Sequence, residues 1–211
     1  NPLLFTGPIF EEASETTLQG ATGEYQTIFY MHLFKLILHY HLGYFQAAFD
    51  YSEKAEPMLP EFRSRLLIHL LPFYQSLAIL QQPEGVEQSS KLSEKLEQNL
   101  QRLHNWAQHA PMNHQHEVDL ILAEKARVTG DTAAAIDHYE AAMNGDRNNE
   151  YLHEEALANE LYGRFWVQRG NETIAQLYLR QAHILYNRWG AAAIVEHLEA
   201  QYPEWLNAKH I

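Results

Sequence analysis

The 211-residue sequence has no cysteine and few basic residues. The first absence excludes disulfide bonds, thiolate metal sites and cysteine nucleophiles, and it fits a reducing compartment. The second leaves 15 Lys and Arg against 27 Asp and Glu, a formal net charge of −12. This charge repels phosphate backbones and anionic lipid headgroups, because the sequence has no local basic patch to reverse the field. We therefore expect neither a nucleic acid nor a membrane as a partner.

Long apolar runs and a leader segment are also missing from the sequence. The stretch LLIHLLPFYQSLAIL is interrupted by His69, Pro72 and Gln75, well short of the roughly 18 apolar residues that a membrane span needs. The chain opens NPLLFTGPIF, without an initiator methionine and without the basic and apolar segments of a secretory signal. We expect a piece of a longer protein with a cytoplasmic location.

Helical periodicity dominates what is present, and strand signals are scarce. In SSKLSEKLEQNLQRLHNW the apolar residues recur every three or four positions, with charged and amide side chains between them. Similar stripes fill most of the chain, and glycines and prolines separate them. The breaks include Gly43, Pro111, Gly130, Gly145 and Gly170. The sequence therefore predicts an all-α protein of helices joined by short turns.

An internal repeat appears when the chain is aligned on three glycines, Gly43, Gly130 and Gly170. Alanines follow each glycine at the fifth and twelfth positions, and a small residue precedes the last two glycines by seven positions. Small residues at this spacing share one helix face and let two helices approach closely. The glycine would end the first helix, and Asp131 or Asn171 would cap the second. The small residues are Ala48, Ala55, Ala123, Ala135, Ala142, Gly163, Ala175 and Ala182, and Leu36 stands at the first preceding position.

This pattern is typical of a tetratricopeptide repeat, a helix-turn-helix unit of about 34 residues. We predict a single domain over 1–211, an all-α, tetratricopeptide-like right-handed superhelix of antiparallel helical hairpins, with an unrelated helical bundle as the alternative. An irregular lead-in would cover 1–22. Hairpins would follow over 24–57, 62–110, 114–144 and 151–188, and a closing helix over 190–201.

Two segments resemble one region of very large bacterial signalling kinases. They are NWAQHAPMNHQHEVDLILAEKARVTGD and HEEALANELYGRFWVQRGNETIAQLYLRQAHILYNRWGAAAIVEHLEAQYP, within a resemblance that spans roughly 20–206. In that family a serine/threonine kinase domain precedes a predicted ATPase module, a long helical-repeat region, a GAF domain and often a histidine kinase. The family commonly has lysines after Arg-Trp-Gly, where this chain has Ala191 to Ala193. The resemblance implies a place in the helical-repeat region.

The sequence predicts no catalytic, cofactor or metal site. It has no phosphate-binding loop and none of the kinase motifs of the resembled family. In HAPMNHQHE, a helix beginning near Asn113 would place His114 and Glu117 on one face and His116 about 200 degrees from His114, so the histidines do not converge on one ion. Asn113 would instead cap that helix. Consecutive carboxylates such as Glu154 and Glu155 diverge by about 100 degrees, which favours a solvated helix face over acid-base chemistry.

The candidate binding surface lies on the first helix of each hairpin, which lines the groove of such superhelices. Along these first helices, the positions counted back from the glycines include polar residues. We expect these residues to recognise a protein or a neighbouring domain of the same chain. The alternative for Glu160 and Arg164 is an i,i+4 pair that braces its own helix by ~0.3 to 0.5 kcal/mol. The predicted groove residues are Tyr40, Glu124, Arg127, Glu160, Arg164 and Gln168.

These observations predict a non-catalytic interaction and relay segment of a multidomain signal-transduction kinase. The main alternative is a small-molecule sensor with an effector in the concave groove, as in the helical-repeat region of the maltose-regulon activator. An enzyme that uses His and Glu residues and a purely structural spacer are further alternatives.

Overall fold

A computed structural model describes residues 3, 22–62, 66–82 and 89–206. Helices account for nearly all of these residues, and no strand occurs among them. The predicted all-α class is confirmed. The chain forms two compact units, which follow one another at residues 86 and 87, and the single domain expected over 1–211 stays a prediction.

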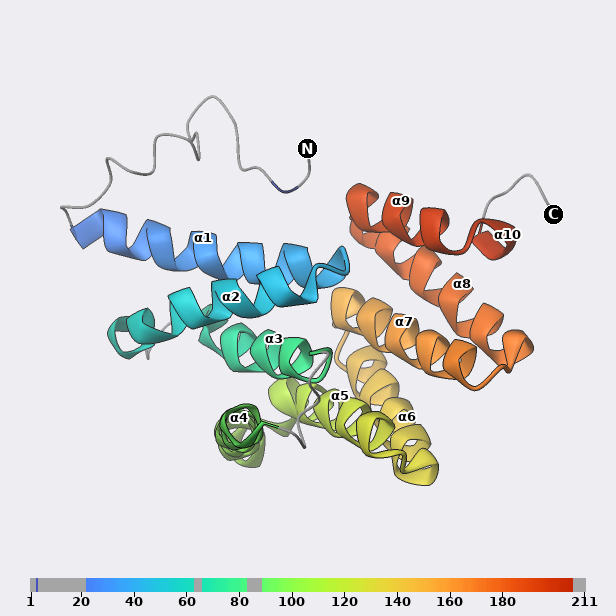
Figure 1. Ribbon diagram of the computed structural model, residues 1–211, viewed down its shortest axis with the longest axis horizontal. Coiled ribbons are helices and arrows are strands. Elements are labelled where there is room, and N and C mark those ends of the chain that lie inside the picture. The colour runs from blue at the N-terminus through green and yellow to red at the C-terminus, as the bar shows by residue number, and fades with distance from the viewer. Residues whose placement is uncertain (1–2, 4–21, 63–65, 83–88, 207–211) are drawn as a thin grey trace. The chain divides into compact units, whose positions relative to one another are not determined.

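The described residues of the amino-terminal unit form the helices α1, α2 and α3 (Figure 1). Helix α1 spans Thr22–His41, α2 spans Phe45–Ala55 and α3 spans Leu70–Ile79, with 3₁₀ turns at Glu56–Phe62 and Leu66–His69. Each helix packs against the other two. Gly43 joins α1 to α2 with a positive φ of 77°, and Tyr44, the N-cap residue of α2, provides no side-chain cap. The core includes the fully buried side chains of Phe29, Leu33, Leu36, Leu71, Phe73 and Leu77.

The carboxy-terminal unit contains the helices α4 to α10 (Figure 1). From α4 to α9 each helix packs against the next one along the chain, and α10 packs on α8 and α9. This unit is therefore a succession of neighbouring helices with its core between consecutive elements. The bounds are α4 Ser90–His109, α5 Pro111–Thr129, α6 Thr132–Asn148, α7 Leu152–Gln168, α8 Glu172–Trp189, α9 Ala192–Gln201 and α10 Pro203–Leu206.

The predicted hairpins α5/α6 and α7/α8 are present with the predicted turn chemistry. Gly130 and Gly170 have φ values of 80° and 71°, in the left-handed region that favours glycine. The Asp131 side chain accepts a hydrogen bond from the backbone N–H of Ala134 at 3.1 Å, and Asn171 accepts one from Ile174 at 3.2 Å. All seven alanines of the repeat pattern are fully buried.

Gly163 of α7 lies close to α8. A Cβ atom at this position would lie 2.7 Å from Leu179 Cγ and 3.1 Å from the Leu179 backbone nitrogen. A side chain of any size therefore requires α8 to move. The small residue seven positions before Gly170 predicted this close approach of the two helices, and the structure confirms it.

Two local expectations differ from the structure. The predicted hairpin over 62–110 stays a prediction, because α3 and α4 belong to different units. Helix α5 begins at Pro111 with Ala110 as its N-cap residue, so Asn113 is not a cap. Gly145 does not end a helix, because α6 continues through it to Asn148. Pro111 starts α5 readily, since proline lacks the backbone N–H that the first helical position leaves unbonded.

Candidate functional site

The predicted groove residues Glu124 and Arg127 belong to a polar group inside the α5/α6 hairpin. Glu124 is 1% exposed. Its carboxylate accepts a hydrogen bond from the Tyr139 hydroxyl of α6 and ion-pairs with Arg127, whose Nη2 lies 2.8 Å from Glu124 Oε2. The Arg127 side chain is partly exposed. The carboxylate thus links the two helices of its own hairpin.

The α7/α8 hairpin contains a similar group. Glu160 is buried and accepts a hydrogen bond from the Tyr186 hydroxyl of α8, at 2.7 Å between Oε2 and the hydroxyl oxygen. Arg164, one turn further along α7, ion-pairs with the same carboxylate. The same guanidinium nitrogen, Nη2, also donates a hydrogen bond to Gln201 Oε1 at 3.3 Å. In both hairpins a buried Glu on the first helix therefore connects a Tyr on the second helix with a partly exposed Arg.

The remaining predicted groove residues lie elsewhere. Tyr40 is buried in the amino-terminal unit, where its ring contacts Phe45 and Tyr74. Gln168 is exposed at the end of α7. Of the five predicted groove residues in the carboxy-terminal unit, Arg127, Arg164 and Gln168 have exposed or partly exposed side chains. Their role in binding remains a prediction.

A buried polar cluster joins α5, α6 and α7. His116 comes from the second turn of α5, Asp146 from the last turn of α6 and Glu154 from the first turn of α7. These side chains are 1 to 4% exposed. His116 Nε2 contacts Glu154 Oε2 directly and lies 3.7 Å from Asp146 Oδ1. The three ligand atoms all lie within 4.8 Å of one another, so the cluster could hold a metal ion.

The electrostatic environment of this cluster is strongly acidic. Burial first, and then the neighbouring carboxylates of Glu154, Glu155 and Glu117, together raise the pKa of Asp146 to about 9. Glu155 is paired with Arg147, whose Nε lies 3.0 Å from Glu155 Oε1. A cation, or protons in its place, would relieve the repulsion between these carboxylates.

The environment of Glu154 and Glu155 differs from the prediction. Both are buried, although the sequence predicted a solvated helix face. Their side chains do diverge along α7, but each meets a partner from another helix, His116 for Glu154 and Arg147 for Glu155. His114 and Glu117 lie on one face as predicted, with 3.0 Å between Nδ1 and Oε2. No spacing within one helix could reveal a cluster drawn from three helices.

Gly145 has no side chain and so lets α6 lie close to His116. The substitution Gly145→Ala tests this close approach. A Cβ atom would lie 3.0 Å from His116 Cβ. Helix propensity alone favours alanine over glycine by about 1 kcal/mol. We expect Gly145→Ala instead to lower the free energy of unfolding by about 1 kcal/mol, because α6 must shift away from α5. Urea unfolding of the wild-type and substituted chains measures the difference, and a gain in stability would show that the contact relaxes easily.

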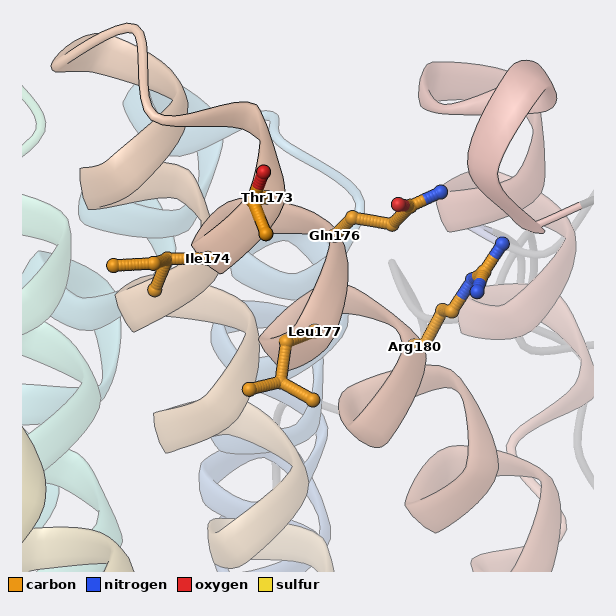
Figure 2. A pocket seen from close by; sticks show the side chains of 5 residues that line it. All are labelled: Thr173, Ile174, Gln176, Leu177 and Arg180. Carbon is orange, nitrogen blue, oxygen red and sulfur yellow. The ribbon is translucent and has the colours of Figure 1, made fainter.

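The exposed apolar side chains on α8 form a second feature. Leu177 is 63% exposed and Ile184 is 51% exposed, and their spacing of seven residues puts them on one helix face. Leu177 also lines an open depression of about 350 Å³ along α8 (Figure 2). In Figure 2 the Ile174 and Leu177 side chains point away from those of Gln176 and Arg180. The full lining is Thr173, Ile174, Gln176, Leu177 and Arg180.

Comparison with known proteins finds a partial similarity. A stretch of 58 residues is 40% identical to the hybrid signal transduction histidine kinase G of Dictyostelium discoideum. The match covers 28% of this chain and 2% of that protein. No family model matches the chain, and no solved structure matches it. Among the helices that the structure describes, none is long and apolar enough to cross a membrane.

Proposed function

We propose that the chain is a tetratricopeptide-like helical-repeat segment of a multidomain signal-transduction kinase in the cytoplasm. It has no catalytic activity of its own and holds neighbouring domains of the same polypeptide. The observation that carries this proposal is the 40% identity over 58 residues to a hybrid signal transduction histidine kinase. The covered 2% of that protein is consistent with a small segment between larger domains.

The two glycine-capped hairpins support the repeat assignment. Both have buried small residues at their contact, a left-handed glycine in the turn and a side-chain cap on the second helix. Hairpins that repeat the same contacts stack in sequence, and stacks of this kind bind partners over extended surfaces. The exposed face of Leu177 and Ile184 on α8 offers apolar area for such a contact.

The proposal is tested in the natural polypeptide that contains this sequence. We expect chemical crosslinks between α8 and the kinase domains. The double substitution Leu177→Asp and Ile184→Asp should reduce these crosslinks at least about 10-fold, because charged side chains cannot enter a dry apolar contact. Gln108→Asp, at an exposed position of α4, is the matched control and should leave the crosslinks unchanged. Crosslinks that survive the double substitution would contradict the assigned face.

The absence of catalysis is tested on the 211-residue chain alone. Incubated with labelled ATP and Mg²⁺, it should neither release phosphate nor become labelled. Acid-labile labelling of a histidine, or ATP hydrolysis that purification does not remove, would overturn the non-catalytic part of the proposal.

A further inference from the structure

We propose that His116, Asp146 and Glu154 form a binding site for one divalent transition-metal ion of the Zn²⁺ class. The ligand atoms are His116 Nε2, Asp146 Oδ1 and Glu154 Oε2, which already lie within 4.8 Å of one another. A Zn²⁺ ion binds imidazole nitrogen and carboxylate oxygen at about 2.0 to 2.2 Å, which puts ligands of a tetrahedral site roughly 3.3 to 3.6 Å apart. The 3.7 Å between His116 Nε2 and Asp146 Oδ1 is close to that separation.

The hydrogen bonding of the cluster is the second observation. Among the described residues, Asp146 Oδ1 and His116 Nδ1 are buried polar atoms without a hydrogen-bond partner, and Glu154 Oε2 has the close contact with His116 Nε2 in place of a regular hydrogen bond. Buried polar atoms in proteins are nearly always bonded, since leaving one unsatisfied is costly. A bound cation would satisfy both carboxylate oxygens at once. Binding would require His116 Nε2 and Glu154 Oε2, now in direct contact, to move apart so that both face the ion.

The donor set determines the class of ion. One imidazole and two carboxylates suit Zn²⁺ and related first-row ions, whereas Ca²⁺ and Mg²⁺ prefer oxygen ligands alone. The charge also fits, because two buried carboxylates balance a divalent cation. With the three side chains at most 4% exposed, a substrate has little access to the ion. The ion would therefore tie α5, α6 and α7 together across the two hairpins, with a water molecule in the coordination position that the three protein ligands leave open.

The site is tested with the whole 211-residue chain after treatment with a chelator and removal of that chelator. Addition of Zn²⁺ is expected to show one ion bound per chain by calorimetry. Because the ion binds only the folded state, the melting temperature should rise by roughly 5 to 10 °C at a free Zn²⁺ concentration about 100 times the dissociation constant. Co²⁺ in place of Zn²⁺ should add visible absorption bands that report nitrogen and oxygen ligation.

Three substitutions distinguish this cluster from the histidines outside it, since His116 is one of the 13 histidines of the chain. Asp146→Asn and Glu154→Gln keep the size of the side chain, and each should abolish the thermal shift and the Co²⁺ bands. Glu199→Gln is the control, because Glu199 pairs with His183 at 2.7 Å in a partly exposed pair on other helices. It should leave binding unchanged.

The outcomes decide the proposal in either direction. Circular dichroism establishes that each variant is folded, and if Asp146→Asn does not fold, Glu154→Gln decides. Absence of a thermal shift in the wild-type chain would overturn the proposal. A shift or Co²⁺ spectrum that persists in Glu154→Gln would also overturn it, because the ion would then be bound at surface histidines. Loss in both cluster variants with retention in Glu199→Gln would support it.

Discussion

Gly163→Ala is expected to lower the free energy of unfolding by about 2 kcal/mol, although alanine is the better helix former. The added methyl group would lie 2.7 Å from Leu179 Cγ and 3.1 Å from the Leu179 backbone nitrogen. The backbone atom cannot rotate away, so α8 must separate from α7 along part of the hairpin. Urea unfolding monitored by circular dichroism measures the loss.

A double-mutant cycle with Leu179→Ala shows whether this contact is the cause. Leu179 is fully buried, and its truncation alone should cost about 2 to 5 kcal/mol. If the alanine at position 163 collides with the Leu179 side chain, the combined variant should lose less stability than the sum of the two single losses, by at least about 0.5 kcal/mol. Additive losses would mean that the backbone contact, or a different neighbour, limits the approach.

Arg164→Glu is expected to lower the free energy of unfolding by about 3 kcal/mol, which is the second large effect. Arg164 is the ion-pair partner of the buried Glu160 carboxylate, which also accepts the Tyr186 hydroxyl hydrogen bond. Charge reversal removes the compensating cation and adds a second negative charge beside the first. The Arg164 side chain is 19% exposed, so solvent screens part of the repulsion and keeps the loss below the upper end of about 5 kcal/mol.

Gln168→Glu is the matched control for this substitution. Gln168 lies one turn further along α7 and is exposed, so the same added charge should change stability by less than about 0.5 kcal/mol. A small effect of Arg164→Glu in the same unfolding measurement would show that Glu160 is already neutral or reaches solvent. Charge reversal at Arg164 would therefore change stability as well as any binding of a partner.

Much of the hairpin structure could be predicted from the sequence, because its determinants are local. A left-handed glycine, a capping Asp131 or Asn171 and small residues seven apart act within a single hairpin, and the structure has all of them. The sequence did not predict which of the groove residues are exposed, since Glu124 and Glu160 are buried. Counting along one helix locates Glu124 and Glu160 on the first helices, but it does not reveal that a Tyr of the second helix covers each carboxylate.

Two identical Gly-Asp dipeptides show what only the tertiary structure decided. At Gly130 the dipeptide ends α5 and Asp131 caps α6, as the sequence by itself predicts. At Gly145 the same dipeptide lies inside α6. There the absence of a side chain at Gly145 leaves room for His116, and Asp146 belongs to the buried cluster. A local preference of about 1 kcal/mol for a turn is smaller than the energy of packing a helix against its neighbours. The sequence alone therefore determined the helical class and the turn chemistry, while contacts between distant residues decided which glycine ends a helix and which carboxylates are buried.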